Sequence, residues 1–379
     1  MARFGIMFIA AVVLAFASPS PAPAPCLVLP DRQPTLRQNW CEAKLVLYGK
    51  FANPRTFTGA VESPTTDFIV EKVLKGDSFN SKIITLNRDI PAANRKKAPK
   101  FVVFIDLHNG IIDPFRGMEV KNARQTLAYL KGVGALTEAP IADRLRFYFK
   151  HLNNPDSEIA FDAFKEFVQT DYKDYKEMAT KLPAETITNW IQDPKTPPDR
   201  LGLYGSLLGL CGTAEHGQFL RKMIDNPTRS KGANLGGFME GYVSLQPKEA
   251  WKYITGLFTD KKQDFVLRYA GVRTARFLWE KRPDFVPKKD LVEGIALLLD
   301  DPEVADFAIE DFRKWKCWEM TDRILPLFGQ KSHEANVVKR AIMRFALQSP
   351  LRSAADFVQA QRSRDPDWVR DTEELLKME

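Results

Sequence analysis

The chain is poor in the residues that most often bind metals or act as catalytic nucleophiles. It holds four cysteines and four histidines in 379 residues. The cysteines form no C-x-x-C pair, so a zinc site has little support. No G-x-S-x-G elbow and no G-x-x-x-x-G-K-[ST] loop is present, which leaves serine hydrolysis and nucleotide hydrolysis without a motif. We therefore expect a non-catalytic protein with no metal and no cofactor.

Long apolar or basic runs are also missing after the N-terminal segment. No later stretch is long and apolar enough to span a bilayer. The 55 Lys and Arg residues are scattered among 48 Asp and Glu residues, with a net charge of +7. A nucleic-acid-binding protein usually concentrates its cations on one face. The densest run, Arg95-Lys96-Lys97 with Lys100, is interpreted as a solvated loop, and no nucleic-acid partner is expected.

The N-terminus has the pattern of a secretory signal peptide. Arg3 precedes an apolar run, Phe4 to Ala17, that ends in the A-x-A site Ala15-Phe16-Ala17. As a helix this run would reach only about 21 Å, short of the roughly 30 Å hydrocarbon core. We expect residues 1–17 to be cleaved and the protein to be exported, to the periplasm or outside the cell. A Pro/Ala-rich tether and strap follow at residues 18–43.

Export makes a disulfide chemically accessible. Cys26 and Cys41 are the candidate pair, which would tie down the strap. The sequence does not fix the connectivity, and three pairings stay open. Cys211 and Cys317 lie in apolar helical contexts and are expected to be buried thiols.

Residues 44–120 are predicted to form a small β-barrel. Short runs rich in Val, Ile, Leu, Phe and Tyr are bounded by turn residues such as Asn, Gly and Pro. The expected strands are Lys44–Phe51, Thr66–Leu74, Lys82–Asn87, Lys100–Leu107 and a shorter piece around Gly117–Val120. Alternation is imperfect, because strands of a small barrel can bury parts of both faces. Five short strands in this length favour closure, which removes exposed edges.

Three segments of this region carry a family resemblance. The stretches AKLVLYGKF, TDFIVEKVLKGD and FVVFIDLHNGIIDPFRG resemble the OB-fold barrel of the netrin-module and metalloproteinase-inhibitor group. The inhibitors of that group begin with Cys-x-Cys and chelate the zinc of their target. This chain reads Cys26-Leu27-Val28 instead, so protease inhibition is not implied.

From residue 121 onward the sequence predicts helices only. The stretch Asp199–Ile224 predicts two helices joined by a turn at Gly212-Thr213. In the first of them Gly202, Gly205 and Gly209 fall three and four apart and leave a stripe without side chains. Each interior glycine costs roughly 1 kcal/mol relative to alanine. The stripe therefore predicts close contact with the backbone of a neighbouring helix.

Small residues recur at matching positions down the chain. These positions, 32 to 37 residues apart, are Gly205, Gly237, Gly271, Ala308 and Ala341. A period of this size made of helix pairs is typical of an α-solenoid, and the drift in repeat length resembles HEAT-like repeats. The expected helices are Asn122–Lys131, Ile141–Leu152, Ser157–Gln169, Leu201–Cys211, Glu215–Ile224, Ala233–Leu245, Lys248–Phe258, Asp264–Trp279, Leu291–Leu299, Glu303–Trp315, Asp322–Phe328, Glu334–Leu347 and Pro366–Met378, the last as a polar cap.

The predicted fold is therefore an α+β multidomain chain. A five-stranded OB-like barrel at residues 44–120 is followed by an all-α, HEAT-like superhelical solenoid at residues 121–379. The whole arrangement resembles secreted bacterial proteins of unassigned role.

Candidate binding chemistry centres on the segment around residue 315. Arg313, Lys314, Trp315 and Trp318 place two tryptophans amid cations, a composition that could stack on a sugar, a base or a partner's aromatic ring. The plainer interpretation, which we favour, is that the tryptophans fill the bend between helices.

The histidines are interpreted structurally. His108 lies near Asp106 and Asp113, and the three side chains together could bind a metal. The simpler interpretation is a turn that Asp113-Pro114 starts and Arg116-Gly117 closes. His151 and His216 are expected at the surface or in caps, and His333 at a helix start.

Two classes of function remain. The first is an exported, non-catalytic protein-binding or scaffold protein that presents an extended helical surface to a protein partner. The alternative is an oligosaccharide- or nucleic-acid-binding protein, or an enzyme, that uses the OB-like barrel and a basic solenoid groove. The sequence does not specify an activity.

Overall fold

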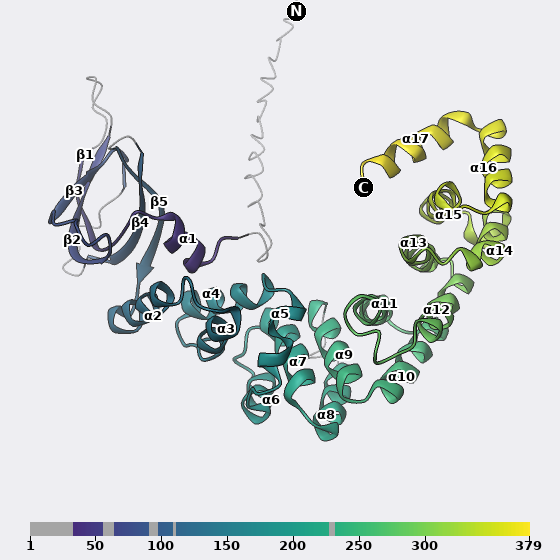
Figure 1. The fold of residues 1–379 in the computed structure, drawn as a ribbon, viewed down its shortest axis with the longest axis horizontal. Helices are drawn as coiled ribbons and strands as arrows, with labels where there is room; N and C mark the ends of the chain where they lie inside the picture. The colour runs from purple at the N-terminus through teal and green to yellow at the C-terminus, as the bar shows by residue number, and fades with distance from the viewer. Residues whose placement is uncertain (1–32, 56–63, 91–97, 109–110, 227–231) are drawn as a thin grey trace, which may run out of the picture.

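The computed structural model describes residues 33–55, 64–90, 98–108, 111–226 and 232–379. Within these residues a five-stranded antiparallel sheet is followed by helices to the end of the chain, which confirms the predicted α+β fold class. Figure 1 shows the sheet at one end of an open arc of helices that follow in chain order. The signal peptide at 1–17, tether residues 18–32, Cys26, the basic run 95–97 and the Asn109-Gly110 turn lie outside the described residues.

The sheet has the connectivity of a small, partly open barrel. Its described strands are β1 (Leu45–Arg55), β2 (Thr65–Lys75), β3 (Ile83–Leu86), β4 (Lys100–His108) and β5 (Ile111–Val120). Neighbours are antiparallel and the spatial order is β3-β2-β1-β4-β5. The two edge strands, β3 and β5, also contact each other, so the sheet curls toward closure.

Strand β1 is buried on both faces. Leu45 and Leu47 join the interior of the barrel with Phe68, whereas Val46 and Tyr48 join the core shared with the helices. Successive side chains of a strand point to opposite faces. The imperfect alternation in the sequence therefore has a simple cause, because helices cover the outer face of this strand.

Strand β5 is longer than predicted. The sequence predicted a turn through Asp113-Pro114 and Arg116-Gly117, but residues 111–120 all belong to the strand. Arg116 lies opposite Phe104 and Pro114 opposite Ile105, so Phe115 is an extra residue at a bulge. A bulge is where a strand tolerates a proline, which has no N–H to donate. The predicted turn is therefore wrong, and the strand continues through it.

The helices lie close to where the sequence placed them. They are α1 (Leu36–Glu42), α2 (Ala123–Ala135), α3 (Ile141–Phe149), α4 (Ser157–Val168), α5 (Tyr172–Ala179), α6 (Ala184–Gln192), α7 (Pro198–Cys211), α8 (Ala214–Ile224), α9 (Ala233–Leu245), α10 (Pro247–Thr259), α11 (Phe265–Lys281), α12 (Lys288–Ala296), α13 (Ala305–Trp315), α14 (Thr321–Ile324), α15 (Asn336–Gln348), α16 (Arg352–Arg364) and α17 (Pro366–Lys377).

Some helices differ from the prediction. Helices α1, α5, α6 and α16 were not predicted. Helix α14 is only four residues long. It is followed by a 3-10 helix at Leu325–Gly329, whose second residue is Pro326. Proline removes an N–H and clashes with the preceding turn, so the α-helix cannot run through to Phe328.

The helices form two layers along the arc. Figure 1 shows α9, α11, α13 and α15 on the concave side and α8, α10, α12 and α14 on the convex side. The largest hydrophobic cluster runs between the layers without a break, from Leu36 to Phe345. A helical array with one continuous core is thus built from pairs that each cover their neighbours.

The glycine stripe marks the closest contact between inner helices. A Cβ on Gly205 would lie 2.9 Å from the carbonyl carbon of Gly237, and a Cβ on Gly209 would overlap the backbone of Gly241. Helices α7 and α9 therefore touch backbone to backbone, as predicted. Gly271, by contrast, faces Phe258 of α10, where a Cβ would lie 2.8 Å from the ring. The stripe is thus a seam between α7 and α9, whereas the small residue at 271 makes room for a ring of the outer layer.

The strap before the barrel is fixed to the first helices by buried polar groups. The N–H of Leu36 donates a 2.6 Å hydrogen bond to Asp162, and the ammonium of Lys165 donates a 2.6 Å bond to the carbonyl of Pro34. Arg37 pairs with Glu166 at 3.2 Å. Asp162 also accepts a 2.7 Å bond from the hydroxyl of Tyr129. Helix α4 thus holds the strap in place, although 126 residues separate Leu36 from Asp162.

Candidate functional site

Helices α11, α13 and α15 lie on the concave side of the arc in Figure 1. Each of them carries exposed or half-buried side chains beside those that it buries in the core. We call one set of these side chains the inner face. Its residues are Phe265, Tyr269, Arg273, Arg276, Asp306, Phe307, Glu310, Val337, Arg340 and Arg344.

Three aromatic rings meet on the inner face. Phe265 and Tyr269 are stacked, with centroids 6.1 Å apart and an interplanar angle of 4°. Phe307 of the next inner helix lies 5.1 Å from Tyr269. Phe265 is 50% exposed although it is apolar. We call these three residues the aromatic group. Exposed aromatics flanked by arginine are enriched at the centres of protein interfaces.

Adjacent inner helices are joined by a ladder of polar contacts. Ser206 donates a 2.9 Å bond to Glu240, Arg276 a 2.7 Å bond to Asp311, and Arg344 a 2.6 Å bond to Glu310. The partners are 34, 35 and 34 residues apart, which is one repeat. Burial raises the pKa of Asp311 to about 6 although Arg276 opposes the shift. Two of these three contacts pair an arginine with a carboxylate, and each contact joins neighbouring inner helices one repeat apart.

The structure separates the four residues of the segment around 315. Arg313 is 5% exposed and bonds to Glu310 at 2.8 Å and to Glu379 at 2.5 Å. Trp315 stacks on Trp279 with centroids 4.3 Å apart. Of the four only Lys314 is exposed, and Trp318 is half-buried. The residues therefore do not form one open surface.

The separation at this segment has a backbone cause. Lys316, in the left-handed conformation with φ 58°, ends helix α13. The chain turns there, and Trp318 contacts Phe345 of α15, with centroids 5.2 Å apart. The two tryptophans thus pack on rings of neighbouring helices on either side of this turn.

The histidines occupy structural positions. Nδ1 of His216 accepts a 3.1 Å hydrogen bond from the N–H of Thr213 and completes the N-terminal cap of α8. His333 is buried and bonds to the carbonyl of Leu299 at 2.9 Å, rather than capping a helix. His151 is half-buried, with its centroid 4.8 Å from the ring of Tyr129, and burial lowers its pKa. His151 was expected at the surface or in a cap, and its half-buried ring lies beside Tyr129 of α2 and Phe147 of α3.

Possible metal ligands and thiols are equally dispersed. Asp113 lies opposite Asp106 in the sheet but pairs with Arg88 at 2.8 Å, and the side chain of His108 lies outside the described residues. Across the described chain no group of three metal-binding side chains forms.

Burial raises the pKa of Cys317 to about 11, and of the half-buried Cys211 likewise to about 11. Cys41 is exposed and unpaired among the described cysteines. Its pairing with Cys26 stays a prediction.

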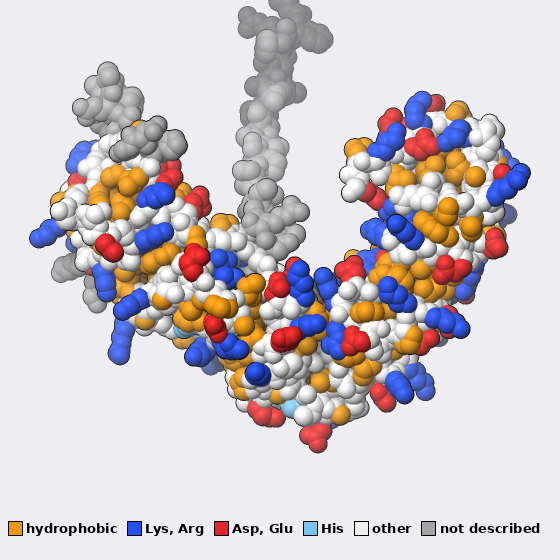
Figure 2. Space-filling view, in the orientation of Figure 1, with side chains coloured by type: hydrophobic (Ala, Val, Ile, Leu, Met, Phe, Trp, Pro, Cys, Tyr) orange, Lys and Arg blue, Asp and Glu red, His pale blue; other side chains and the backbone are white. Residues whose placement is uncertain are grey.

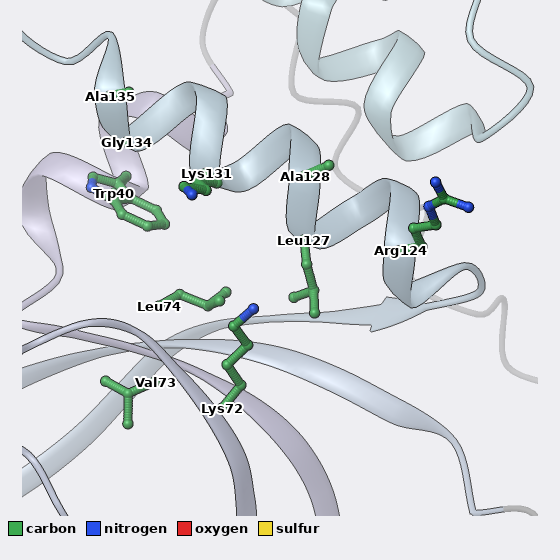
Figure 3. A pocket seen from close by; sticks show the side chains of 10 residues that line it. All are labelled: Trp40, Lys72, Val73, Leu74, Arg124, Leu127, Ala128, Lys131, Gly134 and Ala135. Carbon is green, nitrogen blue, oxygen red and sulfur yellow. The ribbon is translucent and has the colours of Figure 1, made fainter.

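A pocket lies where the barrel meets the helices. It has a volume of about 620 Å³ and is lined by Trp40, Lys72, Val73, Leu74, Arg124, Leu127, Ala128, Lys131, Gly134 and Ala135. We call it the junction pocket. Strand β2 forms one wall, helix α2 the other, and Trp40 of α1 closes one end, as Figure 3 shows. No local pattern predicts this pocket, because its walls come from segments about 30 to 90 residues apart in the chain.

Two further observations concern the length of the helices and the similarity of the chain to known proteins. Over the described ranges, the helices are too short or too polar to cross a membrane. The chain matches no protein-family model, no curated protein and no solved structure.

Proposed function

We propose that this protein is an exported, non-catalytic scaffold that binds a protein partner along the inner face. The observation that carries the proposal is the aromatic group, in which Phe265 is 50% exposed and Tyr269 and Phe307 are half-buried. An apolar ring exposed at the surface leaves a hydrophobic contact to be made by something else. The length of the inner face, three helices wide, suits an extended segment of a partner.

The charge pattern of the array supports a protein partner over a polyanion. Glu310 and Asp311 are bonded to arginines of the neighbouring helices, so much of the positive charge is already neutralised. Figure 2 shows cationic and acidic side chains interspersed along the visible face of the arc. A nucleic acid or sulfated polysaccharide requires a continuous basic track.

Two further parts of the proposal come from the sequence. Export follows from the signal-peptide pattern at residues 1–17. A relation of the barrel to the netrin-module group is supported by its strand order, and a relation of the helical array to HEAT-like repeats is supported by its two-layer arc.

The test compares capture of a partner by three proteins. The wild type is immobilised and exposed to the exported-protein fraction of the source cell, then washed at about 0.5 M salt, which screens exposed charges. The test variant carries Phe265→Ser and Tyr269→Ser. The control carries Ile83→Ser and Ile111→Ser, which remove two apolar side chains on the barrel that are 53% and 61% exposed.

We expect the wild type and the control to retain one protein at stoichiometric amounts, and the test variant to lose it. Loss in the control instead would place the interface on the barrel and contradict the proposal. Retention of heparin or single-stranded DNA, with a steep fall between low and physiological salt, would favour the alternative function.

A further inference from the structure

The end wall of the junction pocket is a fixed aromatic platform. Trp40 is 8% exposed, and its backbone carbonyl accepts a 2.6 Å hydrogen bond from the ammonium of Lys75. A Cβ on Gly134 would lie 2.7 Å from Cε2 of the indole, so the ring can pack against α2 only because this position is glycine. The ring of Trp40 is therefore held against α2, where it forms one end of the pocket.

The pocket is rich in unpaired positive charge. Lys72, Arg124 and Lys131 line it, and the lining includes no acidic residue. Over the described residues none of the three cations forms an ion pair or hydrogen bond. Glu71, which precedes Lys72 in the chain, is paired with Lys100. The three cations therefore have no counter-charge supplied by the neighbouring lining residues.

The apolar and cationic groups are arranged in sequence across the cleft. Figure 3 shows the ammonium of Lys72 in the space between Leu74 and Leu127, Lys131 on α2 near Trp40, and Arg124 directed away at the far end. An apolar body lying on Trp40, Leu74 and Leu127 would bring an attached anionic group within reach of Lys72 and Lys131. A volume of about 620 Å³ falls within the range of small-molecule sites.

We propose that the junction pocket binds an amphipathic organic anion, a molecule with one carboxylate, phosphate or sulfonate group on an apolar body. Lys72 and Lys131 hold the charged group by charge-assisted hydrogen bonds, and Trp40 with Leu127 covers the apolar part. The site is separate from the inner face, so this inference stands or fails independently of the proposed function.

The first experiment uses 8-anilinonaphthalene-1-sulfonate as the probe on the full chain. This dye is an aromatic sulfonate whose fluorescence rises in an apolar site. We expect saturable binding of one dye per chain and displacement by dodecanoate. Dodecanol tests the apolar part alone, dodecyltrimethylammonium reverses the charge, and inorganic phosphate tests the charged group alone. We expect each of these three to displace the dye at least tenfold more weakly than dodecanoate.

Variants then locate the site. Lys72→Gln with Lys131→Gln should weaken dye binding by about tenfold or more, because two charge-assisted contacts are lost. The matched control, Lys173→Gln with Lys289→Gln, removes the same charge from side chains that are 74% and 84% exposed elsewhere. A second pair places an acid in the pocket with Ala128→Glu and on the exposed side of α16 with Ala355→Glu. Only the first of that pair should weaken binding.

Three results would overturn the inference. They are equal weakening in the pocket variants and their controls, equal displacement by the cationic and anionic amphiphiles, or binding of several dyes per chain without saturation. Circular dichroism of each variant shows whether its fold is kept. We expect the fold to be kept, because all substituted side chains in these pairs are exposed.

Discussion

The N–H of Leu36 donates a 2.6 Å hydrogen bond to Oδ1 of Asp162, joining the strap to the first helical layer. Oδ2 of the same carboxylate accepts a 2.7 Å bond from Tyr129, so both oxygens are engaged inside the protein. Asp162 is 2% exposed. One buried carboxylate therefore joins the strap to helices α2 and α4, and substitution of Asp162 tests how much this contributes to stability.

Asp162→Ala is expected to lower the free energy of unfolding by about 1–3 kcal/mol, because the N–H of Leu36 and the hydroxyl of Tyr129 lose their acceptor. Asp162→Asn should cost much less, since an amide keeps one oxygen for Leu36 and its NH₂ can donate to Tyr129. Urea denaturation measures both. Limited proteolysis at the strap should accelerate in the alanine variant alone, and equal acceleration in both would contradict this role.

The wild type and the Asp162→Asn variant should also differ in how their stability depends on pH. Burial raises the pKa of Asp162 to about 6 against the opposing bonds from Leu36 and Tyr129. The folded state then binds this proton more tightly than the unfolded state, so the group's contribution to stability falls as pH rises from about 4 to about 6. The asparagine variant lacks the group. Relative to wild type its stability should improve by up to about 3 kcal/mol between these pH values, and a difference independent of pH would refute the assignment.

The backbone seam between α7 and α9 predicts opposite effects for one substitution at two glycines. Gly209→Ala places a Cβ against the backbone of Gly241 and should destabilise the chain by about 1–3 kcal/mol through overpacking. Gly256→Ala meets no atom within 4 Å and should raise stability by up to about 1 kcal/mol through helix propensity. Thermal melting of the two variants decides. Equal melting temperatures would mean that the seam is not closely packed.

The ladder predicts coupling between α11 and α13. Arg276→Gln leaves Asp311, which is 2% exposed, without its cationic partner and should cost about 1–3 kcal/mol. Adding Asp311→Asn should recover part of that loss, because an amide is cheaper to bury than an unpaired carboxylate. A double-mutant cycle measures the coupling. Strictly additive losses would show that the two residues do not interact, and Lys289→Gln on the exposed pair with Glu293 provides the control.

Arg200 is a buried cation whose position predicts that it can be replaced. It is 5% exposed, lies 4.2 Å from the ring of Phe164, and its Nε and Nη1 lack hydrogen-bond partners in the described structure. Arg200→Met keeps the packing and removes the desolvated charge, so its melting temperature should equal or exceed that of wild type. Arg200→Ala should be less stable than Arg200→Met by about 2–5 kcal/mol because a cavity remains. A methionine variant as unstable as the alanine variant would show that the charge itself matters.

The sequence predicted the features that arise from local periodicity. The Gly202, Gly205 and Gly209 stripe predicted a backbone contact, and the structure confirms it at Gly237 and Gly241. Asp156, directly before the predicted helix Ser157–Gln169, caps that helix, since its side chain accepts from the N–H of Glu158. These features involve residues close together in the chain or a clear repeat.

What the sequence did not predict depends on distant contacts. The bulge at Phe115 needs knowledge of what β4 places opposite Pro114. Arg313 is not available at the surface because it bonds to Glu310, one turn earlier, and to Glu379, which is 66 residues away in the chain. Only the contact with Glu310 could be expected from local sequence. The junction pocket needs the docking of α2 on β2, which no single segment encodes.

The ladder has a consequence for how the protein can vary in length. Its partners are 34 or 35 residues apart wherever it joins two inner helices, and each rung involves only immediate neighbours. A segment of that length could therefore be removed or duplicated only where the helices brought together carry matching groups, as the two arginine–carboxylate rungs do and the glycine seam of α7 and α9 does not. Any change in the length of the arc is thus expected in steps of one hairpin and toward the C-terminal part of the array.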